Sequence, residues 1–235
     1  MNIVLASQSP RRKEFFRLLD LSFVVDAADV DEENHGDLAP DEIVQALSRI
    51  KALTVASRHP DALVVGADTI VVFEGSILGK PADKADAGRM LRALRGREHL
   101  VLSSVTLVHP SGAEVTECAE TVVRMRDYSG DELRAYVGSG DPMDKAGAYA
   151  IQHPVFRPVS EIEGCYASVM GLPLCHVARA FWRVGEPLAI HVPSLCRSET
   201  GHRCAVYPQF WPGLAGSPAD QRETEQNTEA QRNSG

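Results

Sequence analysis

Blocks of apolar and polar positions alternate along the first 185 residues, and they predict alternating strands and helices. Residues 2–6 form an apolar run typical of a strand. Ser9 and Pro10 then offer a hydroxyl cap and a proline at the first helical position, so a helix is expected from there to about residue 19. Residues 40–58 carry apolar side chains at 43, 47, 50 and 54, the spacing of an amphipathic helix.

Alternating strand-like and helix-like segments continue to about residue 185. An apolar run predicts a buried strand over residues 63–73, followed by a turn at 74–76. Helices are expected over 83–94, 131–137 and 173–184, a hairpin of two long strands over 100–108 and 115–125, and a strand over 148–152. Strands and helices in this order predict an α/β fold with a mixed sheet.

The chain changes character after residue 185. Residues 186–215 are rich in Pro, Cys and His without periodicity, and they match no common zinc spacing, so we expect a loosely ordered segment. Residues 216–235 hold no aromatic or branched aliphatic side chain and are expected to be disordered. We therefore predict one domain over residues 1–185 and a C-terminal extension over 186–235.

Composition narrows the class of protein. The chain has 235 residues, 44% of them hydrophobic, and its five cysteines include no C-x-x-C pair, which argues against a disulfide framework. The net charge of −8 argues against non-specific nucleic-acid binding. The apolar run at 63–73 is far shorter than the about 20 residues of a membrane span, and no basic segment precedes the N-terminal apolar run as in a signal peptide. We expect a soluble, intracellular protein without a membrane partner.

Asp68 is the most informative residue, because it lies inside the apolar run LVVGADTIVVF. A buried carboxylate without a partner is costly, so a cation, a metal ion or strong hydrogen-bond donors should lie beside it. Two interpretations remain open at this point: a functional carboxylate in a cleft, and a structural aspartate that caps a strand end or pairs with an arginine.

Several charged residues suit a phosphate ligand. In ASQSPRR (6–12) a strand leads through a serine-rich turn into a helix that begins with Arg11 and Arg12, and free N–H groups at such a start bind anions. A solvated basic first turn is the alternative. Lys51, Lys80 and the acidic run 31–33 each have an ordinary explanation alone, but together they supply cations for phosphates and carboxylates for a magnesium-type ion.

Four sequence blocks resemble the Maf-type nucleoside triphosphate pyrophosphatases over residues 2–184. They are ASQSPRR at 6–12, SRIKA at 48–52, GADTIV at 66–71 with GKP at 79–81, and DKAGAYAIQ at 144–152 with MGLP at 170–173. The resemblance implies an inosine triphosphatase-like (Maf/Ham1) fold, with an elongated mixed sheet and a deep cleft between two lobes. It also implies a cytoplasmic homodimer that uses Mg²⁺ or Mn²⁺ to split nucleotides between the α- and β-phosphates.

The resemblance also implies roles for residues. Asp68 would be the general base and, with Glu32, a metal ligand. The phosphate and metal residues would be Ser7, Arg11, Arg12, Glu32, Lys51 and Lys80. In the branch that acts on dTTP and UTP, base choice would fall on Arg11, Thr69 and Gln152, and an amide can match a uracil or thymine edge.

Two alternatives and two departures accompany this hypothesis. The alternatives are the sister branch that acts on 7-methyl-GTP, which has a different block in place of AYAIQ, and a regulator of septum formation that binds nucleotides without cleaving them. Against the regulator stands the intact Asp68 with its set of cations. The departures are the sequence HPVFRP at 153–158, where the family has a glycine-rich stretch, and Cys165 in place of a small hydroxyl residue.

Overall fold

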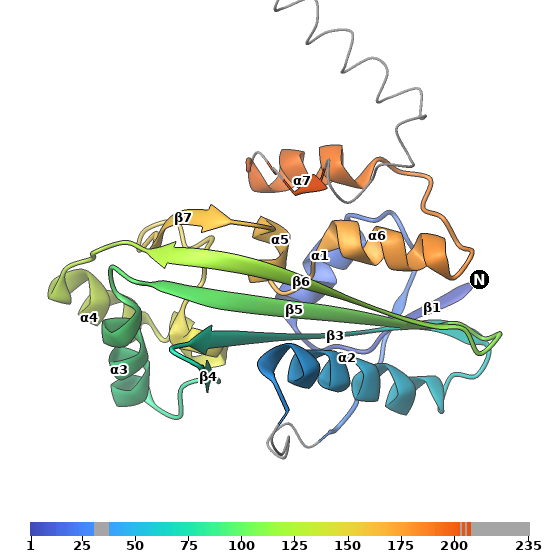
Figure 1. Cartoon of the computed structure of the whole chain (residues 1–235), viewed down its shortest axis with the longest axis horizontal. Coiled ribbons are helices and arrows are strands. Elements are labelled where there is room, and N and C mark those ends of the chain that lie inside the picture. The colour runs from blue at the N-terminus through green and yellow to red at the C-terminus, as the bar shows by residue number, and fades with distance from the viewer. Residues whose placement is uncertain (31–37, 203, 205, 208–235) are drawn as a thin grey trace, which may run out of the picture.

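A mixed β-sheet runs the length of the computed structural model, which describes residues 1–30, 38–202, 204, 206 and 207 (Figure 1). The strand order is β2-β1-β3-β5-β6-β7, with β4 paired to β3. β1 runs parallel to both of its neighbours and the other pairs are antiparallel, which confirms the predicted mixed α/β class. The strands are β1 (Asn2–Leu5), β2 (Val24–Val25), β3 (Ala62–Phe73), β4 (Ser76–Leu78), β5 (Glu98–Val108), β6 (Glu114–Met125) and β7 (Val159–Glu163).

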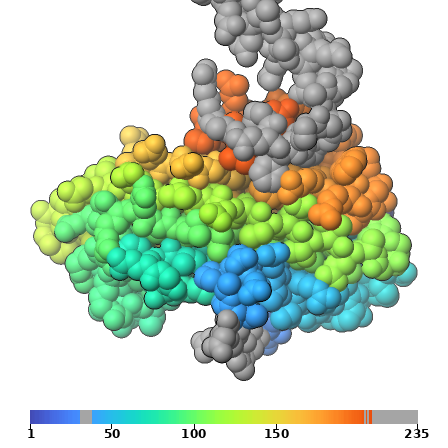
Figure 2. All heavy atoms as spheres, in the orientation of Figure 1, coloured from blue at the N-terminus to red at the C-terminus, as the bar shows by residue number. Residues whose placement is uncertain are grey.

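Helices cover both faces of this sheet. α2 lies along one face, α1, α5 and α6 lie on the other, and α3 and α4 close one end (Figure 1). The space-filling view shows the resulting elongated body (Figure 2). The helices are α1 (Pro10–Arg17), α2 (Pro40–Ala56), α3 (Lys84–Leu94), α4 (Gly130–Ser139), α5 (Tyr166–Val169), α6 (Leu174–Arg183) and α7 (Val192–Thr200), with 3₁₀ turns η1 (Asp141–Asp144) and η2 (Ala146–Ala148).

The central strand β3 is buried on both faces, which explains its continuous apolar sequence. Leu63, Val65 and Ala67 join the core beneath α1 and α6, whereas Val64 faces α2. Successive side chains of a strand point to opposite faces, so covering both faces requires apolar residues at nearly every position. The single ionisable residue of β3, Asp68, therefore enters the interior with the strand.

Most predicted elements are confirmed, and the strand predicted over 148–152 is wrong. Ser9 caps α1 as expected, accepting a hydrogen bond from the Arg12 backbone N–H. Near 148–152, Gly147 and Ala148 take positive φ angles of 68° and 61°, which end any extended strand. The Ala150 N–H then donates to the Tyr136 hydroxyl and not to a neighbouring strand.

The expectation of a loosely ordered segment is wrong for residues 192–200, which form α7. Val192 and Cys196, one helical turn apart, join the apolar cluster from the outer side of α5 and α6 (Figure 1). The disorder expected over 216–235 concerns positions outside the described residues. Within the described residues, no helix has both the length and the apolar character needed to cross a membrane.

Candidate active site

The predicted site residues that the structure describes share one cavity of about 1020 Å³. Its walls come from α1, α2, β3, the loop after β4, and residues 144–152. Glu32 lies outside the described residues. The other predicted residues all line the cavity, namely Ser7, Arg11, Arg12, Lys51, Asp68, Thr69, Lys80 and Gln152.

A buried ion pair forms part of the cavity wall. The Lys51 ammonium lies 2.5 Å from Oδ1 of Asp68, and the two residues are only 8% and 6% exposed. Gly66 permits the contact, because a Cβ atom there would lie 2.4 Å from the Ser48 carbonyl oxygen on α2. The glycine thus lets α2 approach β3 closely enough for Lys51 to reach the carboxylate, and the partner that a buried Asp68 requires is a lysine.

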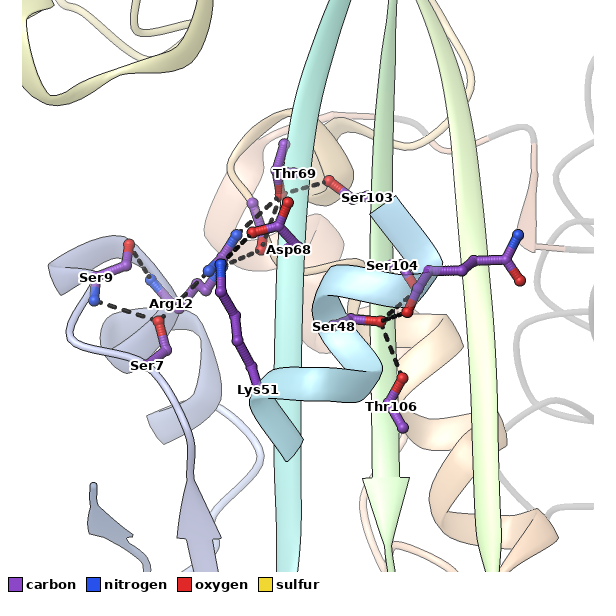
Figure 3. Close-up of polar contacts among 12 residues, drawn as sticks. Ser7, Ser9, Arg12, Ser48, Lys51, Asp68, Thr69, Ser103, Ser104 and Thr106 are labelled. Carbon is purple, nitrogen blue, oxygen red and sulfur yellow. Dashed lines mark hydrogen bonds and ion pairs between the residues drawn. The ribbon is translucent and has the colours of Figure 1, made fainter. Parts of the chain in front are cut away.

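Arg12 is held in place by groups from distant parts of the chain (Figure 3). Its Nε donates to the Gly171 carbonyl at 2.9 Å, and a terminal nitrogen donates to Thr69 Oγ1 at 3.2 Å. Its other terminal nitrogen lies 3.5 Å from Ser7 Oγ. Gly171 has φ +99°, a backbone conformation that a side chain would strain. The guanidinium is therefore oriented before any ligand arrives.

Positive charge is concentrated in the cavity, although the chain as a whole is acidic. One contributor was not predicted from the sequence, namely Lys145, which is 7% exposed and lies 2.6 Å from an oxygen of Asp144. Nothing in its local pattern separates it from a surface lysine. Among the described lining residues, five cations outnumber two carboxylates, so the site favours a polyanionic ligand. The cations are Arg11, Arg12, Lys51, Lys80 and Lys145, and the carboxylates are Asp68 and Asp144.

Tyr136 supports the backbone that presents Gln152. Its hydroxyl accepts from the Ala150 N–H at 3.0 Å and donates to Asp141 at 2.6 Å. Burial and the contact with Asp141 raise the pKa of Tyr136, so the hydroxyl keeps its proton in neutral solution. Gln152 itself is exposed at the cavity wall, where its amide is free to meet a ligand.

Residues 153–158, which replace the glycine-rich stretch of the family, form a rigid rim of the cavity beside Gln152. Phe156 stacks on Tyr136, with ring centroids 4.3 Å apart, and its N–H donates to His153 Nδ1 at 2.9 Å. Pro154 and Pro158 further restrict the backbone. A flexible glycine-rich stretch would make none of these side-chain contacts, so this chain holds the rim more rigidly.

A buried, neutral histidine supports Tyr149, another residue of the cavity wall. His99 Nε2 lies 2.7 Å from the hydroxyl of Tyr149, a residue that lines the cavity. Burial lowers the pKa of His99 to about 4, and Nδ1 has no hydrogen-bond partner in the described part of the chain. A charged imidazole is therefore disfavoured here.

The carboxylate of Asp68 suits a divalent metal ion whose other ligands are phosphate oxygens and water. The described residues contain no group of three or more His, Cys, Asp or Glu side chains that could hold a metal ion. Magnesium in nucleotide sites commonly uses one or two carboxylates together with phosphate oxygens and water. Asp68 provides one such carboxylate, whereas Glu32 lies outside the described residues. Asp68 therefore suits an ion that is brought to the cavity together with a triphosphate.

The chain is similar to several known proteins. A family model described as Maf-like protein matches residues 2–184. A dTTP/UTP pyrophosphatase of Symbiobacterium thermophilum is 46% identical over 187 residues, which cover 79% of this chain and 95% of the relative. One of Moorella thermoacetica is 47% identical over 176 residues, covering 74% and 91%. A solved HAM1 protein from Coxiella burnetii aligns with 18% identity and a TM-score of 0.39, covering 66% and 88%.

Proposed function

Because this chain belongs to the Maf-like protein family, we propose that it is a nucleoside triphosphate pyrophosphatase that hydrolyses dTTP and UTP to the monophosphate and pyrophosphate. The observation that carries the proposal is the buried Lys51–Asp68 pair inside a cavity lined by five cations. Similar relatives named dTTP/UTP pyrophosphatase support the substrate class. They also favour this branch over the 7-methyl-GTP branch.

Asp68 is the general base in this proposal. Lys51 holds Oδ1, which leaves Oδ2 to accept a proton from a water molecule. The water oxygen forms a bond to the α-phosphorus, and the bond from that phosphorus to the α–β bridging oxygen breaks. Pyrophosphate leaves with its negative charge stabilised by Arg11, Arg12 and Lys80. No side chain has to act as a covalent nucleophile.

Asp68, with Glu32, would hold a Mg²⁺ or Mn²⁺ ion, which when bound supplies positive charge against the triphosphate oxygens. Gln152 and Thr69 would hydrogen-bond the pyrimidine, and Arg11 would lie close to both base and phosphates.

A regulator that only binds nucleotides would need no buried base. The homodimer and the cytoplasmic location stay predictions of the resemblance.

The test is an end-point assay over a nucleotide panel. The protein is incubated with Mg²⁺ or Mn²⁺ and UTP, dTTP, CTP, GTP or 7-methyl-GTP, and the products are separated by ion exchange. We expect UMP and pyrophosphate from UTP, and a turnover reduced by about a hundredfold or more in Asp68→Asn, which keeps nucleotide binding. UDP with phosphate, or no turnover, would overturn the proposal. A preference for 7-methyl-GTP would move the chain to the sister branch.

A further inference from the structure

Ser103 lies directly behind a residue of the cavity wall. The antiparallel register of β3 and β5 places Ser103 opposite Thr69, and their hydroxyl oxygens are 2.8 Å apart (Figure 3). Thr69 lines the cavity, whereas Ser103 is fully buried at 0% exposure. Ser103 therefore reaches a ligand only through Thr69.

The hydrogen-bond partners fix which hydroxyl donates. A serine hydroxyl has one proton and two lone pairs. Ser103 donates its proton to the Ser168 carbonyl at 2.6 Å, so it must accept the proton of Thr69. The alternative acceptor for Thr69, the Gly171 carbonyl, is 3.5 Å away, so that contact is longer and weaker than the 2.8 Å contact with Ser103.

The carbonyl that receives the Ser103 proton is itself held firmly. Ser168 is fully buried on α5, and its hydroxyl lies 2.7 Å from both Thr121 Oγ1 on β6 and the Cys165 carbonyl. A buried network whose members are all paired is rigid, because any rotation would leave a polar group without a partner. The orientation of the Ser103 hydroxyl is thus set by the fold and does not depend on a ligand.

Thr69 consequently offers the cavity lone pairs and no proton. One lone pair faces the Arg12 guanidinium at 3.2 Å, and the other is left for a ligand. A ligand group that meets Thr69 must then be a donor. Uracil and thymine carry a proton on N3, whereas N3 of cytosine is an acceptor. Two facing acceptors would repel each other and lose their hydrogen bonds to water.

We propose that Ser103 is a positioning residue that fixes the Thr69 hydroxyl as an acceptor and thereby selects uracil and thymine nucleotides over cytosine nucleotides. This selection rests on the proposed function, because it assumes that a pyrimidine nucleotide binds in the cavity with N3 of its base, and not the exocyclic group at C4, facing Thr69. An accepting Thr69 hydroxyl requires a donor on the base, and the amide at residue 152 cannot impose that requirement. An amide presents both a donor and an acceptor and can rotate to suit either base.

The test is the ratio of kcat/KM for UTP to that for CTP in Ser103→Ala. Without Ser103 the Thr69 hydroxyl rotates freely and can donate, so the ratio should fall by about fivefold or more. The matched control is Ser104→Ala. Ser104 is the next residue of β5 and equally buried, but its hydroxyl contacts Ser48 and the Glu117 carbonyl. That variant should keep the wild-type ratio. In a Thr69→Val background, Ser103→Ala should change the ratio no further.

Binding separates this inference from the proposed function. Non-hydrolysable α,β-imido analogues of UTP and CTP are titrated into the same variants by calorimetry. If the wild type binds the uridine analogue more tightly and Ser103→Ala removes that preference while neither nucleotide is hydrolysed, the proposed activity fails and the role of Ser103 stands. An unchanged ratio in Ser103→Ala, or a wild type without uridine preference in either measurement, would overturn the role of Ser103.

Discussion

Replacing Lys51 by methionine keeps the apolar stem of the side chain and removes the cation beside a carboxylate that is only 6% exposed. At the observed 2.5 Å the Coulomb attraction is about 7 kcal/mol for an effective dielectric constant of about 20. Burying each ion costs several kcal/mol, so the intact pair contributes little net stability. Lys51→Met leaves the desolvation cost without the attraction, and we expect it to lower the free energy of unfolding by about 3–5 kcal/mol.

Urea unfolding at pH 7.5 of the wild type, Lys51→Met, Asp68→Asn and the double variant completes a thermodynamic cycle. The double variant should lose less stability than the sum of the single variants, by about 2 kcal/mol or more. The control is Arg89→Met on α3, which breaks the pair with Asp86 at 2.7 Å but removes a side chain that is 71% exposed. It should cost less than about 1 kcal/mol. Losses that add within about 0.5 kcal/mol would refute the account of a desolvated, coupled pair.

Three further predictions concern the pocket wall, the buried histidine and the extension. Gln152→Ala should lower kcat/KM for UTP by about 5- to 150-fold, which corresponds to about 1–3 kcal/mol, and should lower kcat/KM for GTP less. An equal loss for both nucleotides would reject Gln152 as a specificity residue. Because burial lowers the pKa of His99 to about 4, below its unfolded value of about 6.5, stability should fall as the pH drops from 6.5 towards 4. His99→Gln should show a shallower loss of unfolding free energy between pH 7 and pH 5, and equal slopes would contradict this. Truncation after Gly185 removes Val192 and Cys196 from the core and should cost roughly 3 kcal/mol, so an unchanged Tm would rule out a stabilising extension.

Local chemistry made part of the fold predictable. The start of α1 follows from Ser9 and Pro10, and the burial of β3 follows from its unbroken apolar sequence. Segments whose hydrogen bonds run to distant groups were not predictable in this way. Residues 148–152 have an apolar sequence that suits a strand, but their backbone pairs with the Tyr136 hydroxyl. The short elements β2, β7 and α5 are defined by their neighbours in space, so their own sequences carry little signal.

In the candidate site too, some features could be predicted from the sequence and others depend on contacts between distant residues. The need of Asp68 for a partner could be predicted from burial, but the identity of that partner could not. Lys51 has the pattern of an ordinary amphipathic-helix lysine, and its contact depends on the close approach that Gly66 allows. Ser103 looks like one polar position in an apolar strand, and its connection to Thr69 exists only through the register of β3 and β5.

The proposed reaction is the attack of water on the α-phosphorus of a pyrimidine nucleoside triphosphate. Its decisive test is hydrolysis of UTP in H₂¹⁸O, followed by mass spectrometry of both products. We expect one ¹⁸O atom in UMP and none in pyrophosphate. Label in pyrophosphate would show attack at the β-phosphorus, and label in free phosphate with UDP as the other product would show attack at the γ-phosphorus. Either result would contradict attack at the α-phosphorus.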